Sequence, residues 1–208
     1  MTTQIKLCGF KNIEDIIFAS SLDIDYLGMI FVQDMPRTID IKTAIRAVSI
    51  CQDNDIKSVG VFLNQSVEDI SSILNKVDLD IIQLHGNENI DDYTIFNKDI
   101  ISTIHASENI QSQLSKINLN KHMHLIDATD NQMRGGSGIT FDWNILKDLD
   151  CEKLFIAGGL KPDNILDLLS RYTPKCVDVS SGIERKVGYK DHKIMSDFVE
   201  TIRTYYEK

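Results

Sequence analysis

The chain has few cysteines and few prolines, and it lacks the long apolar run that a membrane helix requires. Its four cysteines (Cys8, Cys51, Cys151 and Cys176) form neither a CxxC pair nor a zinc-type spacing. Only three prolines occur in 208 residues, and no low-complexity linker divides the sequence. No apolar stretch approaches the ~20 residues that span a bilayer. We therefore expect one domain over residues 1–208, without a membrane anchor.

Basic residues are fewer than acidic ones, with 22 lysines and arginines against 31 aspartates and glutamates. The net charge is −9 and the pI is about 5.0, which disfavours nucleic acid as a partner because its phosphate backbone is bound by basic surfaces. A local pocket can still hold a small anion. The N-terminus lacks the charged region and apolar run of a signal peptide. The reducing cytoplasm is therefore the expected compartment for the four thiols.

Short β-type runs alternate with helical stretches along the whole chain. The eight runs are Ile5–Gly9, Tyr26–Phe31, Ser58–Phe62, Ile81–Gly86, Ile100–Ala106, His124–Ala128, Leu154–Gly159 and Val177–Gly182. Such alternation predicts repeated βα units. An open doubly wound sheet has the same alternation, but the count of eight and the polar residues at the strand ends favour a single (βα)8 barrel of the TIM type. At 208 residues the chain is short for this fold, so brief connections are expected.

Helical periodicity fills the gaps between the β-type runs. Ser66 stands at an N-cap position, and Pro162 is expected in the first turn of the penultimate helix. The stretch Ser107–Lys116 carries only a modest helical pattern. The apolar residues expected to face the sheet are Val67, Ile70, Ile73, Leu74 and Val77, then Ile165, Leu166 and Leu169, and in the last helix Ile194, Phe198, Ile202 and Tyr206.

Alternation along the strands predicts charged side chains inside the barrel. In the first strand Lys6 and Cys8 share the inward face, and in the last strand Asp178 and Ser180 do so. The sixth strand places Asp127 inward. Lys6 and Asp178 become neighbours when the barrel closes, so we expect an internal ion pair, which either serves the site or only neutralises itself in the interior.

Cys8 and Asp127 are candidate catalytic groups because each stands at the carboxyl end of its strand, where such barrels carry their active sites. A thiol and a carboxyl facing each other across the barrel mouth can supply a base and an acid. The alternative for Cys8 is a small buried apolar residue, which is the usual state of a lone cysteine.

Two glycine-containing loops follow the seventh and eighth strands. Gly158 and Gly159 leave the seventh strand, and Ser180, Ser181 and Gly182 leave the eighth. Glycine lets backbone N–H groups approach an anion, and the loops at these two positions are a frequent phosphate site of the barrel. Ordinary turns are the alternative. Together the loops predict a phosphorylated small-molecule substrate.

Two further segments are candidates for substrate contact. Gly135, Gly136, Ser137 and Gly138 follow the sixth strand and can form a mobile flap, or merely a flexible connection. Arg37 follows a proline that stiffens its approach, and its guanidinium can grip a carboxylate with two hydrogen bonds. An exposed arginine without a specific contact is the alternative.

These segments, in this order, resemble a known family. The shared motifs are Lys6-Leu7-Cys8-Gly9, Pro36-Arg37, Gly60-Val61-Phe62, Gln83-Leu84-His85-Gly86, Leu125-Ile126-Asp127, Gly135-Gly136-Ser137-Gly138, Ala157-Gly158-Gly159-Leu160 and Val177-Asp178-Val179-Ser180-Ser181-Gly182-Ile183-Glu184. The set is similar to that of the phosphoribosylanthranilate isomerases of tryptophan biosynthesis, from Ile5 to the final helix.

The resemblance implies an Amadori rearrangement, the third step of tryptophan synthesis from chorismate. N-(5-phosphoribosyl)anthranilate would become 1-(2-carboxyphenylamino)-1-deoxyribulose 5-phosphate without a metal or organic cofactor. By resemblance, Asp127 is the general acid, Cys8 the general base and Arg37 the ligand of the anthranilate carboxylate. The loops after strands seven and eight would hold the phosphate, with Asp178 counted among the substrate-binding residues. The sequence leaves open whether the protein is a monomer or a homodimer.

Two other functions share parts of this pattern. A pentulose-phosphate epimerase would bring histidine and carboxylate metal ligands from several strands, but His85 and His105 lack matching carboxylates at strand ends, and His122 and His124 lie at the opposite end. An indole-glycerol-phosphate synthase would leave Cys8 without an obvious role. A barrel that binds a phosphorylated ligand without turnover is the alternative outside enzymes.

Overall fold

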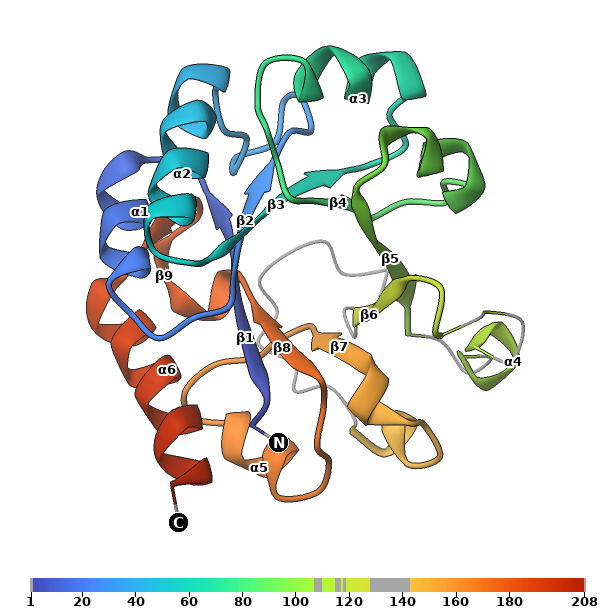
Figure 1. Cartoon of the computed structure of the whole chain (residues 1–208). Coiled ribbons are helices and arrows are strands. Elements are labelled where there is room, and N and C mark those ends of the chain that lie inside the picture. Colours follow the sequence, from blue (N-terminus) through green and yellow to red (C-terminus); the bar gives the residue numbers. More distant parts are fainter. Residues whose placement is uncertain (1, 107–109, 115–116, 118, 128–142, 208) are drawn as a thin grey trace.

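Eight parallel strands close into a barrel (Figure 1) in the computed structural model, which describes residues 2–106, 110–114, 117, 119–127 and 143–207. The strands are β1 (Gln4–Phe10), β2 (Tyr26–Ile30), β3 (Lys57–Phe62), β4 (Ile81–Leu84), β5 (Asp99–His105), β6 (Met123–Asp127), β7 (Leu154–Ala157) and β8 (Cys176–Val179). They pair in chain order, and β8 returns to pair with β1. The predicted barrel is thus confirmed, and the open sheet is excluded.

Helices and short turns surround the strands (Figure 1). The helices are α1 (Ile13–Ser20), α2 (Ile41–Asp53), α3 (Val67–Leu74), α4 (Ile110–Leu114), α5 (Ile165–Leu169) and α6 (His192–Tyr206). Single-turn or irregular 3₁₀ segments are η1 (Ile90–Phe96), η2 (Trp143–Leu146), η3 (Cys151–Lys153) and η4 (Ser181–Ile183). A small antiparallel hairpin, β9 (Glu184–Lys186) and β10 (Tyr189–Lys190), follows η4 and precedes α6.

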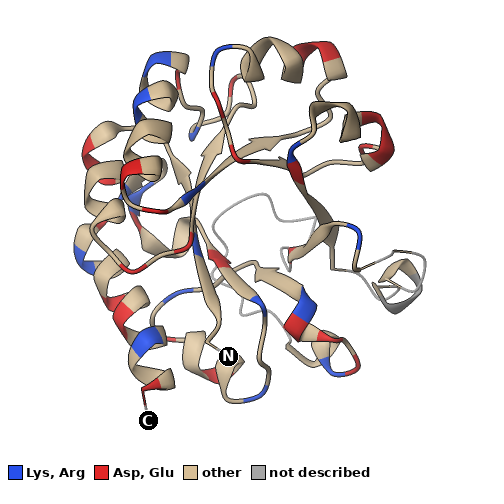
Figure 2. Cartoon of the chain, viewed as in Figure 1, with Lys and Arg blue, Asp and Glu red and all other residues tan. Residues whose placement is uncertain are grey.

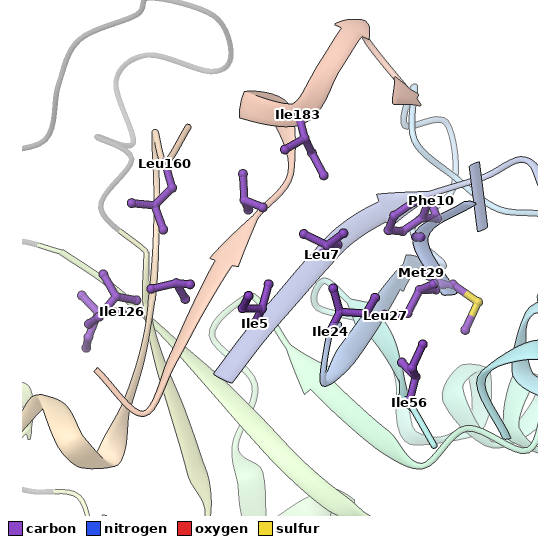
Figure 3. Packing of buried hydrophobic residues seen from close by; sticks show 14 of the residues in the cluster. Ile5, Leu7, Phe10, Ile24, Leu27, Met29, Ile56, Ile126, Leu160 and Ile183 are labelled. Carbon is purple, nitrogen blue, oxygen red and sulfur yellow. The ribbon is translucent and has the colours of Figure 1, made fainter. Parts of the chain in front are cut away.

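The layer between strands and helices is apolar because alternate strand residues point outward. Ile5 and Leu7 of β1 are fully buried there, and they belong to one cluster with Leu27 and Met29 of β2 (Figure 3). Val177 and Val179 of β8 and Ile126 of β6 join the same cluster. The strand residues that the sequence predicts to face the helices are therefore found in this outer layer.

A second, smaller cluster fills the barrel interior. Its members are Tyr26, Val59, Ile81, Ile101, Leu125, Phe155, Ala157 and Cys176. They alternate with outward-facing neighbours along their strands, as Leu125 does with Ile126. The interior is therefore a packed core at this level, and the polar groups of the barrel lie beyond it.

The helix starts agree with the sequence for α3 and differ for α5. Ser66 caps α3, since its hydroxyl accepts a hydrogen bond from the Asp69 backbone N–H at 3.1 Å. Pro162 lies in a turn ahead of α5 instead of in its first turn. Asn164 closes this turn by accepting from the Lys161 backbone N–H at 2.9 Å, so the helix begins only at Ile165.

The short helix α5 also differs in the face that it buries. Ile165, Leu168 and Leu169 are buried, whereas Leu166 is 44% exposed. The expectation that Leu166 faces the sheet is therefore wrong. Ile165, Leu168 and Leu169 have the i, i+3, i+4 spacing of one helix face, and Leu166, one position after Ile165, lies outside it.

The last helix ties the two ends of the chain together. Its buried residues include Phe198 and Ile202, and the Tyr206 hydroxyl lies 2.6 Å from the Thr3 hydroxyl at the start of β1. Basic and acidic residues both lie along the ribbons of the outer helices (Figure 2). Among the described residues, no helix is both long enough and apolar enough to cross a bilayer.

Candidate active site

Cys8 lies near the carboxyl end of β1, and a glycine on the next strand makes room for its thiol. Cys8 pairs with Gly28 of β2, and a β-carbon added to Gly28 would lie 2.5 Å from the Cys8 Sγ. Any larger residue at this position would displace the thiol. Cys8 is 6% exposed, so it borders the interior instead of projecting into solvent.

Beneath Cys8 lies the internal ion pair that the sequence predicts. Lys6 and Asp178 are direct neighbours in the β1–β8 register, and Lys6 Nζ donates to Asp178 Oδ1 at 3.0 Å. The Lys6 side chain is fully buried and that of Asp178 nearly so. Burial opposes the charge of Lys6, but Asp178 and Cys8 outweigh it and raise the pKa of the ammonium. Lys6 is therefore a permanent cation below the thiol, and the predicted pair is confirmed.

Removing one partner of this pair should destabilise the barrel. Lys6→Met leaves a buried carboxylate without its counter-ion, and such changes cost about 3 kcal/mol or more in the free energy of unfolding. The double variant Lys6→Met/Asp178→Leu removes both charges and should recover most of that loss. Urea unfolding followed by circular dichroism measures both values. A single variant as stable as the parent would contradict the expectation.

Burial dominates the acidity of Cys8. It raises the pKa of the thiol more than the neighbouring Lys6 lowers it, and Asp178 adds to the increase. Lys190 also lowers the pKa, but by less. The protein without substrate therefore holds Cys8 mainly as a thiol. An additional positive charge nearby would stabilise the thiolate and so favour loss of the thiol proton.

Asp127 ends β6 and lies at the same end of the barrel as Cys8. The register runs from Asp127 to Ala157 of β7, then to Asp178 of β8 and on to Lys6 of β1. Because all eight strands are parallel, both candidate groups lie at the carboxyl ends, with two strands between them. The Asp127 side chain is 14% exposed, so solvent reaches it only in part.

A histidine stands beside Asp127. His85, the residue after β4, places its Nε2 at 3.5 Å from Asp127 Oδ2, and its Nδ1 lies 3.1 Å from the Thr103 hydroxyl. His105 Nε2 contacts the His85 carbonyl at 3.1 Å. The sequence did not predict the contact between His85 and Asp127, although Gln83 and His85 have the inward parity on their strand that would have signalled it.

The two glycine-containing loops meet at the same end of the barrel. Gly158 and Gly159 have positive φ angles of 100° and 67°, which favour glycine. A β-carbon on Gly182 would lie 1.8 Å from the Leu160 carbonyl oxygen, so the loops touch through this position. Gly159 and Ser181 are exposed. The helix α5 begins only at Ile165, beyond the loop after β7, whereas the single turn η4 begins at Ser181 within the loop after β8.

Arg37 is held by a residue for which the sequence predicts no role. Its Nε and Nη2 each donate to a carboxylate oxygen of Glu184 at 2.8 Å, and the Arg37 side chain is 25% exposed. This side chain reaches the first strand, since a β-carbon on Gly9 would lie 3.1 Å from its Cδ and 2.7 Å from the Ser180 hydroxyl. Arg37, Ser180 and the segment after Cys8 are thus adjacent.

The remaining candidates are placed differently. The predicted flap Gly135–Gly138 lies outside the described residues.

A cavity of about 560 Å³ opens at the opposite end of the barrel, among residues such as Lys98, His122 and Lys175 at the amino ends of strands. Lys98 is paired there with Asp78 at 2.8 Å. This cavity is separate from the mouth that carries Cys8 and Asp127.

Comparison with known proteins agrees with this geometry. Residues 5–201 match the family model described as N-(5'phosphoribosyl)anthranilate (PRA) isomerase. An N-(5'-phosphoribosyl)anthranilate isomerase of Caldanaerobacter subterraneus subsp. tengcongensis is 36% identical, over 96% of this chain and 98% of that protein. The homologue of Legionella pneumophila strain Paris is also 36% identical, over 96% of each chain.

Solved structures give the same result. The crystal structure of phosphoribosyl anthranilate isomerase from Thermotoga maritima has a TM-score of 0.85 and 30% identity, covering 98% of this chain and 100% of that one. A structure of the enzyme in complex with reduced 1-(o-carboxyphenylamino)-1-deoxyribulose 5-phosphate has a TM-score of 0.82 and 28% identity, with coverage of 98% and 100%. The Thermotoga enzyme is described as dimeric. This chain belongs to the phosphoribosylanthranilate isomerase family.

Proposed function

We propose that Cys8 and Asp127 carry out the reaction of this family, the conversion of N-(5-phosphoribosyl)anthranilate into 1-(2-carboxyphenylamino)-1-deoxyribulose 5-phosphate in tryptophan biosynthesis. One observation supports the assignment above others: Asp127 ends β6 and Cys8 lies near the end of β1 at the same mouth of the barrel. The register through Ala157 and Asp178 places Asp127 level with Lys6, two residues before Cys8. The loops after β7 and β8, which form the proposed phosphate site, begin at this mouth as well.

Asp127 acts first. As a carboxylic acid it gives its proton to the furanose ring oxygen, so that the ring opens to a protonated Schiff base. The positive imine then acidifies the proton on the sugar C2. The charge of the imine also favours loss of the Cys8 thiol proton to solvent. The thiolate then takes the C2 proton, and the resulting enolamine tautomerises to the ketone.

The charges around Cys8 suit this sequence of steps. Lys6, Arg37 and Lys190 are cations near the thiol that favour its anionic form, while Asp178 and Glu184 are their carboxylate partners. The group therefore has one net positive charge, which a thiolate would neutralise. Because burial raises the pKa of Cys8, the thiolate is a strong base once the cationic imine has formed beside it.

The substrate's two anionic groups have separate sites in this proposal. The phosphate lies on the backbone of Gly158, Gly159, Ser181 and Gly182 with the Ser180 hydroxyl nearby. The repulsion between two anions argues against Asp178 as a direct phosphate ligand. Its contact with Lys6 at 3.0 Å gives Asp178 a different role, which is to keep that cation beneath Cys8.

The anthranilate carboxylate is bound by Arg37 in this proposal. Glu184 occupies the Nε–Nη2 edge of the guanidinium. Of the five N–H donors of an arginine, three remain, and the end-on pair formed by Nη1 and Nη2 can bind a second carboxylate with two hydrogen bonds.

A direct assay tests the activity. Purified protein is added to freshly prepared N-(5-phosphoribosyl)anthranilate, and the loss of its fluorescence is followed together with the appearance of the deoxyribulose product. Turnover supports the proposal. Binding of the phosphorylated substrate without product would instead indicate a ligand-binding barrel, and release of a different phosphorylated sugar would indicate another barrel enzyme.

The reactivity of the thiol provides a second test. Since the pKa of Cys8 is raised, its thiolate fraction at each pH is below that of an ordinary thiol and increases as the pH rises. Alkylation of Cys8 by iodoacetamide, located by peptide mass spectrometry, should therefore accelerate about tenfold per pH unit and continue past pH ~8.5, where a free cysteine levels off. A plateau near pH ~7 would mean that the thiolate already exists without substrate.

The four cysteines fit a reducing compartment. Cys8, Cys51, Cys151 and Cys176 are all free and buried, and a catalytic thiol must stay reduced to act as a base. We therefore infer that the enzyme works in the cytoplasm on a small phosphorylated substrate. Activity that survives oxidation of Cys8 would contradict this inference.

A further inference from the structure

Glu184 is a buried carboxylate with an unusually complete set of donors. Besides the two bonds from Arg37, its Oε1 accepts from Lys190 Nζ at 3.2 Å and from the Gly188 backbone N–H at 3.2 Å. The Glu184 side chain is 4% exposed. Burial opposes its charge, but the bonds from Arg37 and the charge of Lys190 lower the pKa of the carboxyl. Glu184 is thus an anion fixed between two cations.

Lys190 is anchored as firmly as Glu184. Its Nζ also donates to the Ser180 carbonyl at 2.9 Å, and its backbone N–H donates to Asp15 Oδ2 at 2.9 Å. The Lys190 side chain is 1% exposed. Glu184 and Lys190 come from the two strands of the β9–β10 hairpin, where they pair directly. The hairpin therefore connects the loop after β8, through Ser180, with Arg37 after β2.

This network lies next to the proposed chemistry. Gly9 follows Cys8 and has a φ of 79°. A β-carbon at this position would lie 2.7 Å from the Ser180 hydroxyl, 3.1 Å from Arg37 Cδ and 3.5 Å from Lys190 Nζ. These groups thus converge on the residue after the proposed base, where a side chain would separate them.

We propose that Glu184 is a positioning residue: together with Lys190 it fixes Arg37 so that the free end-on edge of the guanidinium faces the substrate's aromatic carboxylate. The inference rests on the proposed role of Arg37. A long arginine side chain loses conformational freedom when it binds a ligand, and an arginine that is already held in place avoids much of that loss. Without Glu184, Arg37 and Lys190 would repel each other, and the guanidinium would turn toward solvent.

Two ligands separate this role from a general structural one. The first is reduced 1-(2-carboxyphenylamino)-1-deoxyribulose 5-phosphate, and the second is the same compound without the aromatic carboxyl group. Glu184→Gln and Glu184→Asp should weaken binding of the first ligand roughly 10- to 100-fold. The reason is that the hydrogen bonds between Arg37 and the ligand's aromatic carboxylate are lost or misplaced when Arg37 is no longer held in position. Binding of the second ligand should change little. With substrate, both variants should raise KM more than they lower kcat.

Asp80→Asn is a matched control. Asp80 is a partly buried carboxylate that accepts from the Ser58 backbone N–H at 2.9 Å and from the Ser58 hydroxyl at 2.7 Å, just before β4 and thus at the opposite end of the barrel. Its loss should lower stability and leave the affinities for both ligands unchanged. Glu184→Asp keeps the negative charge, so it decides the question if Glu184→Gln fails to fold.

The outcomes distinguish the two proposals. If Arg37→Ala does not reduce the preference for the carboxylated ligand, the role of Arg37 itself is wrong. If Arg37→Ala removes that preference while the folded Glu184 variants retain it, the positioning role of Glu184 is overturned. If Glu184 acts through Arg37, adding Glu184→Gln to Arg37→Ala should weaken the carboxylated ligand no further.

Discussion

Cys8→Ala should lower kcat by about 10³-fold or more while KM for N-(5-phosphoribosyl)anthranilate changes little. A positioned general base contributes about 10² to 10⁴ in rate, and alanine has no group that can take the C2 proton. A 10³-fold loss corresponds to about 4 kcal/mol of transition-state stabilisation. The substitution removes a single sulfur atom next to Gly28, so the fold should persist. Initial rates with fluorescence detection measure the effect.

Cys176→Ala is the matched control for this experiment. Cys176 is also a free, fully buried cysteine that points into the barrel interior, but it begins β8 and thus lies away from the mouth. It should lose a similar packing contact and keep nearly full activity. Cys8→Ser should behave like Cys8→Ala because a hydroxyl ionises far less readily than a thiol. A Cys8→Ala variant with near-normal kcat would disprove the role of the thiol.

The barrel could be predicted from the sequence because its signal is local and repeated. All eight predicted strands are present, each within a few residues of its expected bounds. Ile5 and Leu7 face the helices, while Lys6 and Cys8 lie on the inward face, as simple alternation requires. Closure of the barrel then made the partner of Lys6 predictable, since the last strand comes to lie beside the first.

The network around Glu184 could not be predicted in this way. Glu184 and Arg37 are 147 positions apart, and the Lys190 backbone contacts Asp15 across 175 positions. Both Glu184 and Lys190 belong to a short hairpin outside the barrel, where charged side chains are normally exposed. No local periodicity marks a buried position there. The contact arises because the hairpin lies beside the segment after β2, where a β-carbon on Gly188 would be 2.8 Å from the Pro36 carbonyl oxygen.

The start of α5 shows a different limit. Pro162 favours a helical first turn, but the Asn164 side chain bonds both the Lys161 backbone N–H and the Gly159 carbonyl, each at 2.9 Å. These side-chain bonds hold the segment from Gly159 to Asn164 in a turn, and the helix begins after it, at Ile165. Asparagine competes with helix formation through such bonds, and here its partners come from the loop after β7.

Asp127→Asn should also lower kcat by about 10³-fold. The affinity of the variant for the reduced product analogue should stay unchanged. An amide has nearly the shape of the carboxyl group and can keep a contact with His85, but it cannot give a proton to the ring oxygen, and general acids contribute about 10² to 10⁴ in rate. Asp25→Asn is the matched control, since this carboxylate accepts from the Ile5 backbone N–H at 2.8 Å at the opposite end of the barrel; its loss should affect stability alone.

The contact between His85 and Asp127 makes this experiment decisive for the acid. His85 Nε2 lies 3.5 Å from Asp127 Oδ2, so a protonated imidazole is the competing proton donor at this wall of the barrel. If Asp127→Asn keeps more than roughly a tenth of kcat and His85→Gln does not, the imidazole is the acid and the carboxylate only orients it. If Asp127→Asn abolishes turnover while His85→Gln lowers it modestly, the histidine holds the carboxyl group in place for a proton transfer that Asp127 itself performs.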